Sequence, residues 1–132
     1  MRSILVLGDR SDAMAARLDA ALALARDWNG HVTVLIDTPV RRYIAMDPMG
    51  GSYVASTAMQ QALAEDDAYA GEVEAELAGK GVPFEILRSE AEPIDALADA
   101  ARLADLVIVS RSSDLGGELA LAARAPGLVL PD

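Results

Sequence analysis

A polar segment in the C-terminal part of the sequence has the residue types that bind anions. It directly follows the apolar run Leu106–Val109. Its hydroxyl groups and its guanidinium group can donate hydrogen bonds to a phosphate or a carboxylate. Two glycines follow after a short interval, and glycine lets backbone N–H groups approach an anion closely. The candidate anion-binding residues are Ser110, Arg111, Ser112, Ser113, Gly116 and Gly117.

A second candidate segment follows the first apolar run of the chain. Asp9 and Arg10 come just after the run Ile4–Leu7, separated from it by one glycine. In an open parallel sheet, ligands bind beyond the carboxyl ends of the central strands. If both apolar runs are central strands, Asp9 and Ser110 lie at the same edge of the sheet. This edge is therefore the predicted ligand site.

The elements that must position these residues alternate between strand and helix. Fully apolar runs are typical of strands buried in a parallel sheet, and the runs between them have helical periodicity. Right-handed connections then predict one parallel sheet with helices on both faces, in a single domain spanning residues 1–132. The predicted strands are 4–7, 31–36, 82–87, 106–109 and 128–130, and the predicted helices are 13–28, 57–79, one starting at Glu92-Pro93, and a short Ala/Leu-rich one before residue 128.

Local signals define several ends of these elements. Ser11 or Asp12 is predicted to cap the first helix, and Asn29 with Gly30 to end it. Pro83 has no N–H group for a ladder, so the strand 82–87 is predicted at a sheet edge, or Pro83 at its start. The first helix is expected to bury one face, made of Met14, Leu18, Ala21, Leu22 and Ala25.

The segment 38–56 is expected to be irregular. It contains two prolines and a pair of glycines, together with tyrosines and methionines that suit an adaptable contact surface. A loop of this length in a compact domain is usually functional or mobile. The segment is therefore a candidate contact site for protein partners, and burial of these side chains over the sheet edge is the alternative.

Composition and charge argue against several classes of partner. The formal net charge is -10, and the residues from Gln61 onward contain fifteen Asp and Glu against five Lys and Arg. Such a surface repels nucleic acid and disfavours an anionic membrane. The chain has no cysteine, no secretory signal pattern, and no apolar run near the roughly 20 residues of a membrane span. A cytoplasmic location is expected.

Few residues suggest catalysis or metal binding. His31 is the only histidine, and it opens a strand, whereas Ser110 and Ser112 follow one, so no Ser–His pair is expected at the site. Asp9, Asp12 and Asp37 could converge on Mg²⁺, but Asp12 is expected to cap a helix instead. We therefore expect neither an enzyme nor a metal site.

The order of these motifs resembles the universal stress protein family over nearly the whole chain. The resemblance rests on ILVLGDRS, HVTVLID, KGVPFEIL and EPIDALADAARLADLVIVS at their respective spacings. It implies a Rossmann-like three-layer sandwich with a five-stranded parallel sheet, strand order 3-2-1-4-5, flanked by four helices. It also implies a cytoplasmic stress-response protein, often a homodimer paired through its last strand, here Leu128-Val129-Leu130.

The resemblance separates two functional hypotheses. Members that bind ATP carry the pattern G-x2-G-x9-G-[S/T] after the fourth strand, and here Ser110 and Ser113 occupy the first two glycine positions. Asp9 matches the aspartate that lies near ribose and adenine, and Val34 lies on the strand whose edge touches adenine. The first hypothesis is an interaction or regulatory module without an intact ATP-binding loop. The alternative is a nucleotide-binding protein with a divergent phosphate loop, which would take ATP or AMP.

Overall fold

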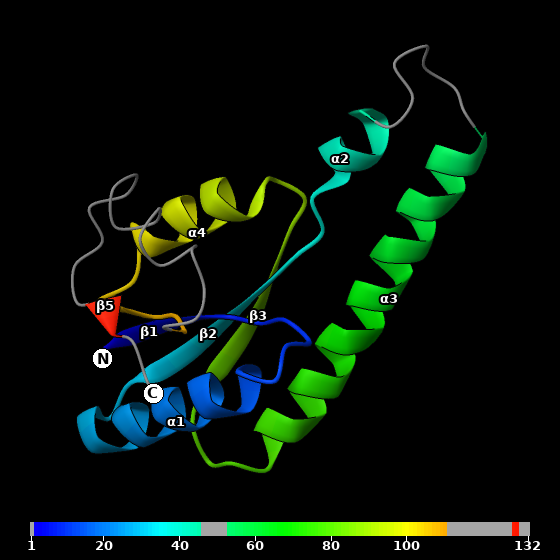
Figure 1. Ribbon diagram of the computed structural model, residues 1–132. Coiled ribbons are helices and arrows are strands. Elements are labelled where there is room, and N and C mark those ends of the chain that lie inside the picture. Colours follow the sequence, from blue (N-terminus) through cyan, green and yellow to red (C-terminus); the bar gives the residue numbers. More distant parts are fainter. Residues whose placement is uncertain (1, 46–52, 111–127, 130–132) are drawn as a thin grey trace.

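The structure, a computed structural model, describes residues 2–45, 53–110 and 128–129. Strands and helices alternate along most of the chain, as Figure 1 shows. In chain order the elements are β1 (Ser3–Leu7), α1 (Met14–Trp28), β2 (His31–Asp37), α2 (Val40–Ala45), α3 (Tyr53–Ala78), β3 (Phe84–Ser89), α4 (Pro93–Ala101), β4 (Leu106–Ile108) and β5 (Leu128–Val129).

All strand pairs of the sheet are parallel, and the strand order is β3-β2-β1-β4-β5. The predicted α/β class and the parallel order of the first four strands are confirmed. The last strand contributes two residues beside β4. β3 lies at one edge of the sheet, as the proline in this region predicts, and Pro83 just precedes the strand and accepts a hydrogen bond from Val32 N through its carbonyl.

Two apolar layers hold the sheet between helices. Alternate strand residues, among them Ile4, Val6 and Val34, pack with α1 and α3 on one face. The intervening residues, among them Leu5 and Leu35, pack with α4 on the other face. Figure 1 shows α1 and α3 together on one side of the sheet and α4 on the opposite side. This alternation follows from the period of two along a strand, and it confirms a sheet covered on both faces.

Helix α1 buries the predicted face and one further residue. Met14, Leu18, Ala21, Leu22 and Ala25 are all buried, as the spacing predicts, and Arg17 is buried with them. Asn29 ends the helix in the left-handed conformation at φ 52°. The predicted N-cap is wrong, because Ala13 occupies the cap position and no side chain bonds the first turn. Ser11 is hydrogen-bonded to Asp9 instead.

Other predicted boundaries also need correction. The segment 38–56 is not irregular throughout, because Val40–Ala45 forms α2 and α3 begins at Tyr53 rather than near residue 57. β3 begins two residues later than predicted and extends to Ser89. Pro93 occupies the first turn of α4, as predicted. The helix predicted before residue 128 lies outside the described residues.

Within the described ranges, no helix has both the length and the apolar character needed to cross a membrane. The longest, α3, has 26 residues but carries acidic side chains along its length.

Candidate functional site at the carboxyl ends of the strands

Asp9 lies directly beyond the carboxyl end of β1. The preceding residue, Gly8, continues the ladder by donating its N–H to Leu35 O at 2.7 Å. A Cβ atom on Gly8 would lie 2.7 Å from a Val34 methyl group, so the close approach of β1 to β2 requires glycine here. The Asp9 Oδ1 atom accepts hydrogen bonds from the Ser11 backbone N–H at 3.0 Å and from the Ser11 hydroxyl. The carboxylate is therefore fixed by its own loop.

Arg17 joins the two strand ends that the sequence predicts to form the site. Its side chain is only 3% exposed and reaches from α1 toward the sheet. One terminal nitrogen donates to Asp9 Oδ1 at 2.6 Å, and the other donates to the Ser110 hydroxyl at 2.7 Å. Because Ser110 follows β4, the guanidinium connects the carboxyl ends of β1 and β4. We refer to Asp9, Arg17 and Ser110 as the arginine bridge.

The arginine bridge was not predicted from the sequence. The signal that could have revealed it is the position of Arg17 on the apolar stripe of α1, three residues after Met14 and directly before Leu18. A charged residue on a buried stripe needs a partner, since burial of an unpaired charge is very costly. Its Nε atom is buried and has no hydrogen-bond partner among the described residues. The side chain is thus held mainly by its two terminal nitrogens.

Arg10 turns away from the arginine bridge and binds α3. Its terminal nitrogens donate to Asp66 Oδ1 at 2.9 Å and to Glu65 O at 2.6 Å, and its guanidinium lies 4.7 Å from the centre of the Tyr69 ring. The Tyr69 hydroxyl in turn donates to Asp9 O. Burial, followed by the nearby charge of Asp9, raises the pKa of Tyr69 above its usual value. Arg10 and Tyr69 therefore join the Asp9 loop to α3.

A groove of about 390 Å³ lies beside the Asp9 loop, between α1 and α3. Met14, Leu18 and Val73 line it with apolar side chains, and its charged lining residues are Asp9, Arg10, Glu72 and Glu76. Three carboxylates against one guanidinium, which is itself paired with Asp66, give the groove a net negative charge that disfavours anion binding.

A second polar cluster lies at the carboxyl ends of β2 and β3. Arg88 donates to Ile36 O, to the Thr38 hydroxyl at 3.0 Å and to Asp67 Oδ1 at 2.9 Å. The Thr38 hydroxyl donates to Asp66, which also binds Arg10. This network fastens α3 to the sheet edge along the same end as the arginine bridge.

Asp37 is the titratable group with a strongly shifted pKa in this region. Burial raises the pKa of its carboxyl from 3.8 to about 6, and the negative charge of Glu92 adds to the increase. The Ser89 hydroxyl, Arg88 and Arg42 act in the opposite direction. The Ser89 hydroxyl is near enough to favour the carboxylate, but neither carboxylate oxygen has a hydrogen bond of ordinary geometry within the described structure. Burial is therefore the controlling influence.

The structure brings together only some of the predicted site residues. Asp9 and Ser110 meet through Arg17, whereas Arg10 binds α3. Val34 is fully buried and packs in the core between the sheet and α1. The remaining predicted residues, Arg111, Ser112, Ser113, Gly116 and Gly117, lie outside the described residues.

The structure also shows where the candidate metal-binding and catalytic residues lie. No cluster of three or more His, Cys, Asp or Glu side chains suited to a metal occurs in the part of the chain that the structure describes. Asp9 and Asp37 belong to the separate polar groups described above. His31 lies beside Ser3 at the amino end of the sheet, with 3.5 Å between its Nε2 atom and the Ser3 hydroxyl, while Ser110 binds Arg17.

The strand order, the two helical layers and a polar site beyond β1 and β4 define an α/β protein of the open parallel-sheet class. The chain belongs to the universal stress protein family, because the family model matches residues 1–122. The resemblance inferred from the sequence motifs is thereby confirmed.

Solved structures of universal stress proteins have the same overall fold. A family member from Burkholderia pseudomallei is 25% identical, with a TM-score of 0.73, and the match covers 98% of this chain and 96% of that one. A protein from Archaeoglobus fulgidus, solved in complex with dAMP, is 19% identical with a TM-score of 0.60, covering 100% and 98%. A universal stress protein in complex with cAMP is 16% identical with a TM-score of 0.59, covering 99% and 98%. No curated relative matches the chain.

Proposed function

We propose that the chain is a stress-response interaction or regulatory module that acts without ATP binding and without catalysis. The observation that carries this proposal is the arginine bridge. The Asp9 carboxylate and the Ser110 hydroxyl, both candidates for contact with a nucleotide, already bind the buried Arg17. A nucleotide that used Asp9 Oδ1 or the acceptor side of the Ser110 hydroxyl would compete with a guanidinium that is itself only 3% exposed.

The charge of the neighbouring surface supports the same proposal. Glu72 and Glu76 line the groove beside Asp9. A polyphosphate entering from this side meets mainly acidic side chains, and the cation that lines the groove, Arg10, is already paired with Asp66. The serines that replace glycine in the phosphate pattern reduce the close backbone approach that phosphate binding uses.

The alternative function is nucleotide binding at the same edge of the sheet. Its support is that family members of similar fold were solved with dAMP and with cAMP. In this alternative, Arg17 stays in place and adds positive charge beneath the nucleotide, while Asp9 contacts the ribose. The two functions therefore differ in whether Asp9 contributes to binding.

Calorimetric titration with Mg·ATP, ADP and AMP distinguishes these functions. The proposal predicts no measurable heat and no thermal shift at millimolar nucleotide. Micromolar binding that is lost in Asp9→Asn but kept in Asp12→Asn would overturn it and establish the alternative. Asp12 is a suitable control because it is exposed and lies three residues from Asp9 on the same loop.

We further propose that the protein is a cytoplasmic homodimer paired through its C-terminal edge strand. β5 pairs with β4 on one side and is the outermost strand of the sheet, and an unpaired edge is a template for another strand. The family resemblance supports both the dimer and the cytoplasmic location. Sedimentation equilibrium should show a dimer for the wild type and a monomer for Val129→Lys, and cell fractionation tests the location.

The segment 38–56 is the proposed contact site for protein partners. On α2, Ile44 is 63% exposed, so this segment presents a large aliphatic side chain to a partner. Ile44→Ser should weaken recovery of bound partners in a pull-down from stressed cells. Recovery equal to that of the wild type would remove this segment from consideration.

A further inference from the structure

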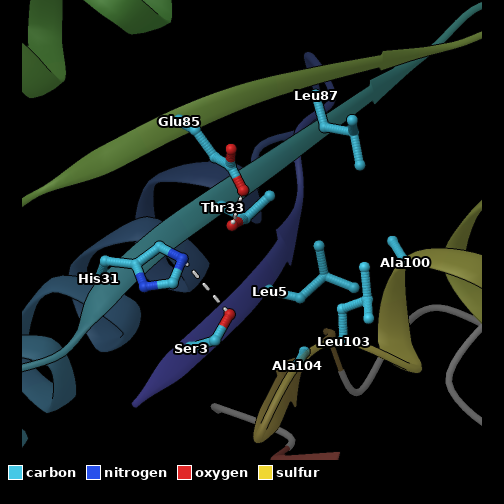
Figure 2. Close-up of a pocket in the computed structure, with 9 residues that line it drawn as sticks. All are labelled: Ser3, Leu5, His31, Thr33, Glu85, Leu87, Ala100, Leu103 and Ala104. Carbon is cyan, nitrogen blue, oxygen red and sulfur yellow. Dashed lines mark hydrogen bonds between the residues drawn. The ribbon is translucent and has the colours of Figure 1, made fainter. Parts of the chain in front are cut away.

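A second hollow lies on the α4 face of the sheet, near the amino ends of the strands. Figure 2 shows side chains from β1, β2, β3 and the end of α4 around a cavity of about 280 Å³. It is therefore at the opposite end of the sheet from the arginine bridge. The nine lining residues are Ser3, Leu5, His31, Thr33, Glu85, Leu87, Ala100, Leu103 and Ala104.

The strand register explains why these side chains surround one space. Ser3 is paired with His31, and Thr33 is paired with both Leu5 and Glu85, so their side chains point to the same face of adjacent strands. Helix α4 ends at Ala101, and the residues that approach the hollow from this side include the small Ala100 and Ala104. Small side chains on the helix side leave the space above Leu5 and Thr33 unfilled.

The walls of the hollow are mainly apolar, with polar groups gathered on one side. Leu87 is 41% exposed and Leu103 is 87% exposed, although both are large aliphatic residues. Their exposure at the mouth of a cavity is the arrangement expected where an apolar ligand is covered on binding. A volume near the lower end of the roughly 300–1,000 Å³ range of ligand pockets suits a molecule of one or two rings.

The polar side of the hollow favours a hydrogen-bond donor or a cation. The buried Thr33 hydroxyl donates to Glu85 Oε1 at 3.0 Å, which holds the exposed carboxylate over the cavity. Asp105 lies close by and accepts a hydrogen bond from Ser3 N at 2.8 Å. None of the nine lining residues is a lysine or an arginine. The local charge is thus negative, which excludes phosphate and other anions.

We propose that this hollow binds a small aromatic amine, with its ring against Leu5, Leu87 and Leu103 and its ammonium group at Glu85. Thr33 acts as a positioning residue that orients the Glu85 carboxylate. His31 and Ser3, whose contact of 3.5 Å leaves hydrogen-bonding capacity free, complete the polar side.

Three ligands that share one ring system test the charge selectivity of the hollow. The ¹⁵N-labelled full chain is titrated with tryptamine, indole and indole-3-acetate, which are cationic, neutral and anionic. Tryptamine should shift amide resonances of the lining residues with the highest affinity, and indole should bind about fivefold more weakly, because a partly exposed ion pair contributes up to about that factor. Indole-3-acetate should cause the smallest shifts.

Two matched glutamate variants separate a specific site from attraction to an acidic protein. Glu85→Gln should reduce tryptamine affinity about fivefold and leave indole binding unchanged. Glu74→Gln removes the same charge from an exposed position on α3, on the other face of the sheet, and should change neither. Leu103→Ser, at a highly exposed position that tolerates substitution, should weaken tryptamine and indole equally.

Specific outcomes would overturn the proposal. These are an absence of shifts at the lining residues at millimolar tryptamine, equal binding of all three ligands, or equal effects of Glu85→Gln and Glu74→Gln. Because these ligands lack phosphate and the hollow is distant from the arginine bridge, the result is independent of the nucleotide titration.

Discussion

Replacement of Arg17 by methionine tests whether the arginine bridge stabilises the fold. Methionine keeps most of the volume in an unbranched, shorter side chain and donates no hydrogen bond. The buried Ser110 hydroxyl then loses its donor, at a cost of about 1 kcal/mol. The Asp9 side chain is 41% exposed, so water screens the lost ion pair, which is worth about 1 kcal/mol. We expect the free energy of unfolding to fall by about 2 kcal/mol.

Urea denaturation followed by circular dichroism measures this difference, and a thermal scan should show a midpoint lower by about 8 °C. Arg26→Met is the matched control, because Arg26 is an exposed residue of the same helix whose contact is one hydrogen bond to Lys80 O. It should change stability by less than about 0.5 kcal/mol. If Arg17→Met were as stable as the wild type, the cost of burying the guanidinium would equal the gain from its contacts, and the reasoning would be refuted.

Three further changes have defined outcomes. Asp37→Asn should stabilise the protein above pH 6 by about 1 kcal/mol after discounting for solvent screening. Because the carboxyl pKa is raised in the folded state, the wild type loses stability as pH rises from 3.8 to about 6, so the gain from the substitution should vanish near pH 4. Urea midpoints measured across this pH range would show the difference. Tyr69→Phe should cost about 1 kcal/mol by removing the hydrogen bond to Asp9 O, measured in the same way. Gly30→Ala should be strongly destabilising, because the added Cβ would lie 2.4 Å from the Arg2 backbone oxygen. Gly71→Ala should instead raise the thermal midpoint, because Gly71 lies inside α3 with open space around it and alanine is the better helix former.

The sequence predicts the sheet well because the central strands β1 and β4 are apolar on both faces. A strand such as Ile4–Leu7 has no polar side to place in water, so only a central position in a covered sheet suits it. The buried stripe of α1 follows equally directly from helical spacing. Boundaries that depend on tertiary contacts were harder to predict. Ser11 is a good capping residue in isolation, but its hydroxyl instead binds Asp9.

The candidate site was predicted only in outline, for a related reason. Topology places Asp9 and Ser110 at one edge of the sheet, and that inference needs only strand order. Their actual partner, Arg17, comes from a helix, and its role depends on a distance across the sheet that sequence spacing does not encode. Helical spacing alone would place Arg17 on the buried stripe of α1, and this position is the one feature of the sequence that indicates a buried partner for Arg17.

The two ends of the sheet therefore differ in what they can bind. At the carboxyl end, the buried cation Arg17 pairs with Asp9 and donates to the Ser110 hydroxyl, so both of these groups already have a partner within the chain. At the amino end, Glu85 is held by Thr33 above an apolar hollow and has no cation among the residues that line it. In our proposal the internal counter-ion weakens ligand binding at the first site, whereas the second site suits a ligand that brings its own positive charge. The same electrostatic reasoning thus predicts weak nucleotide binding at one end and selectivity for amines at the other.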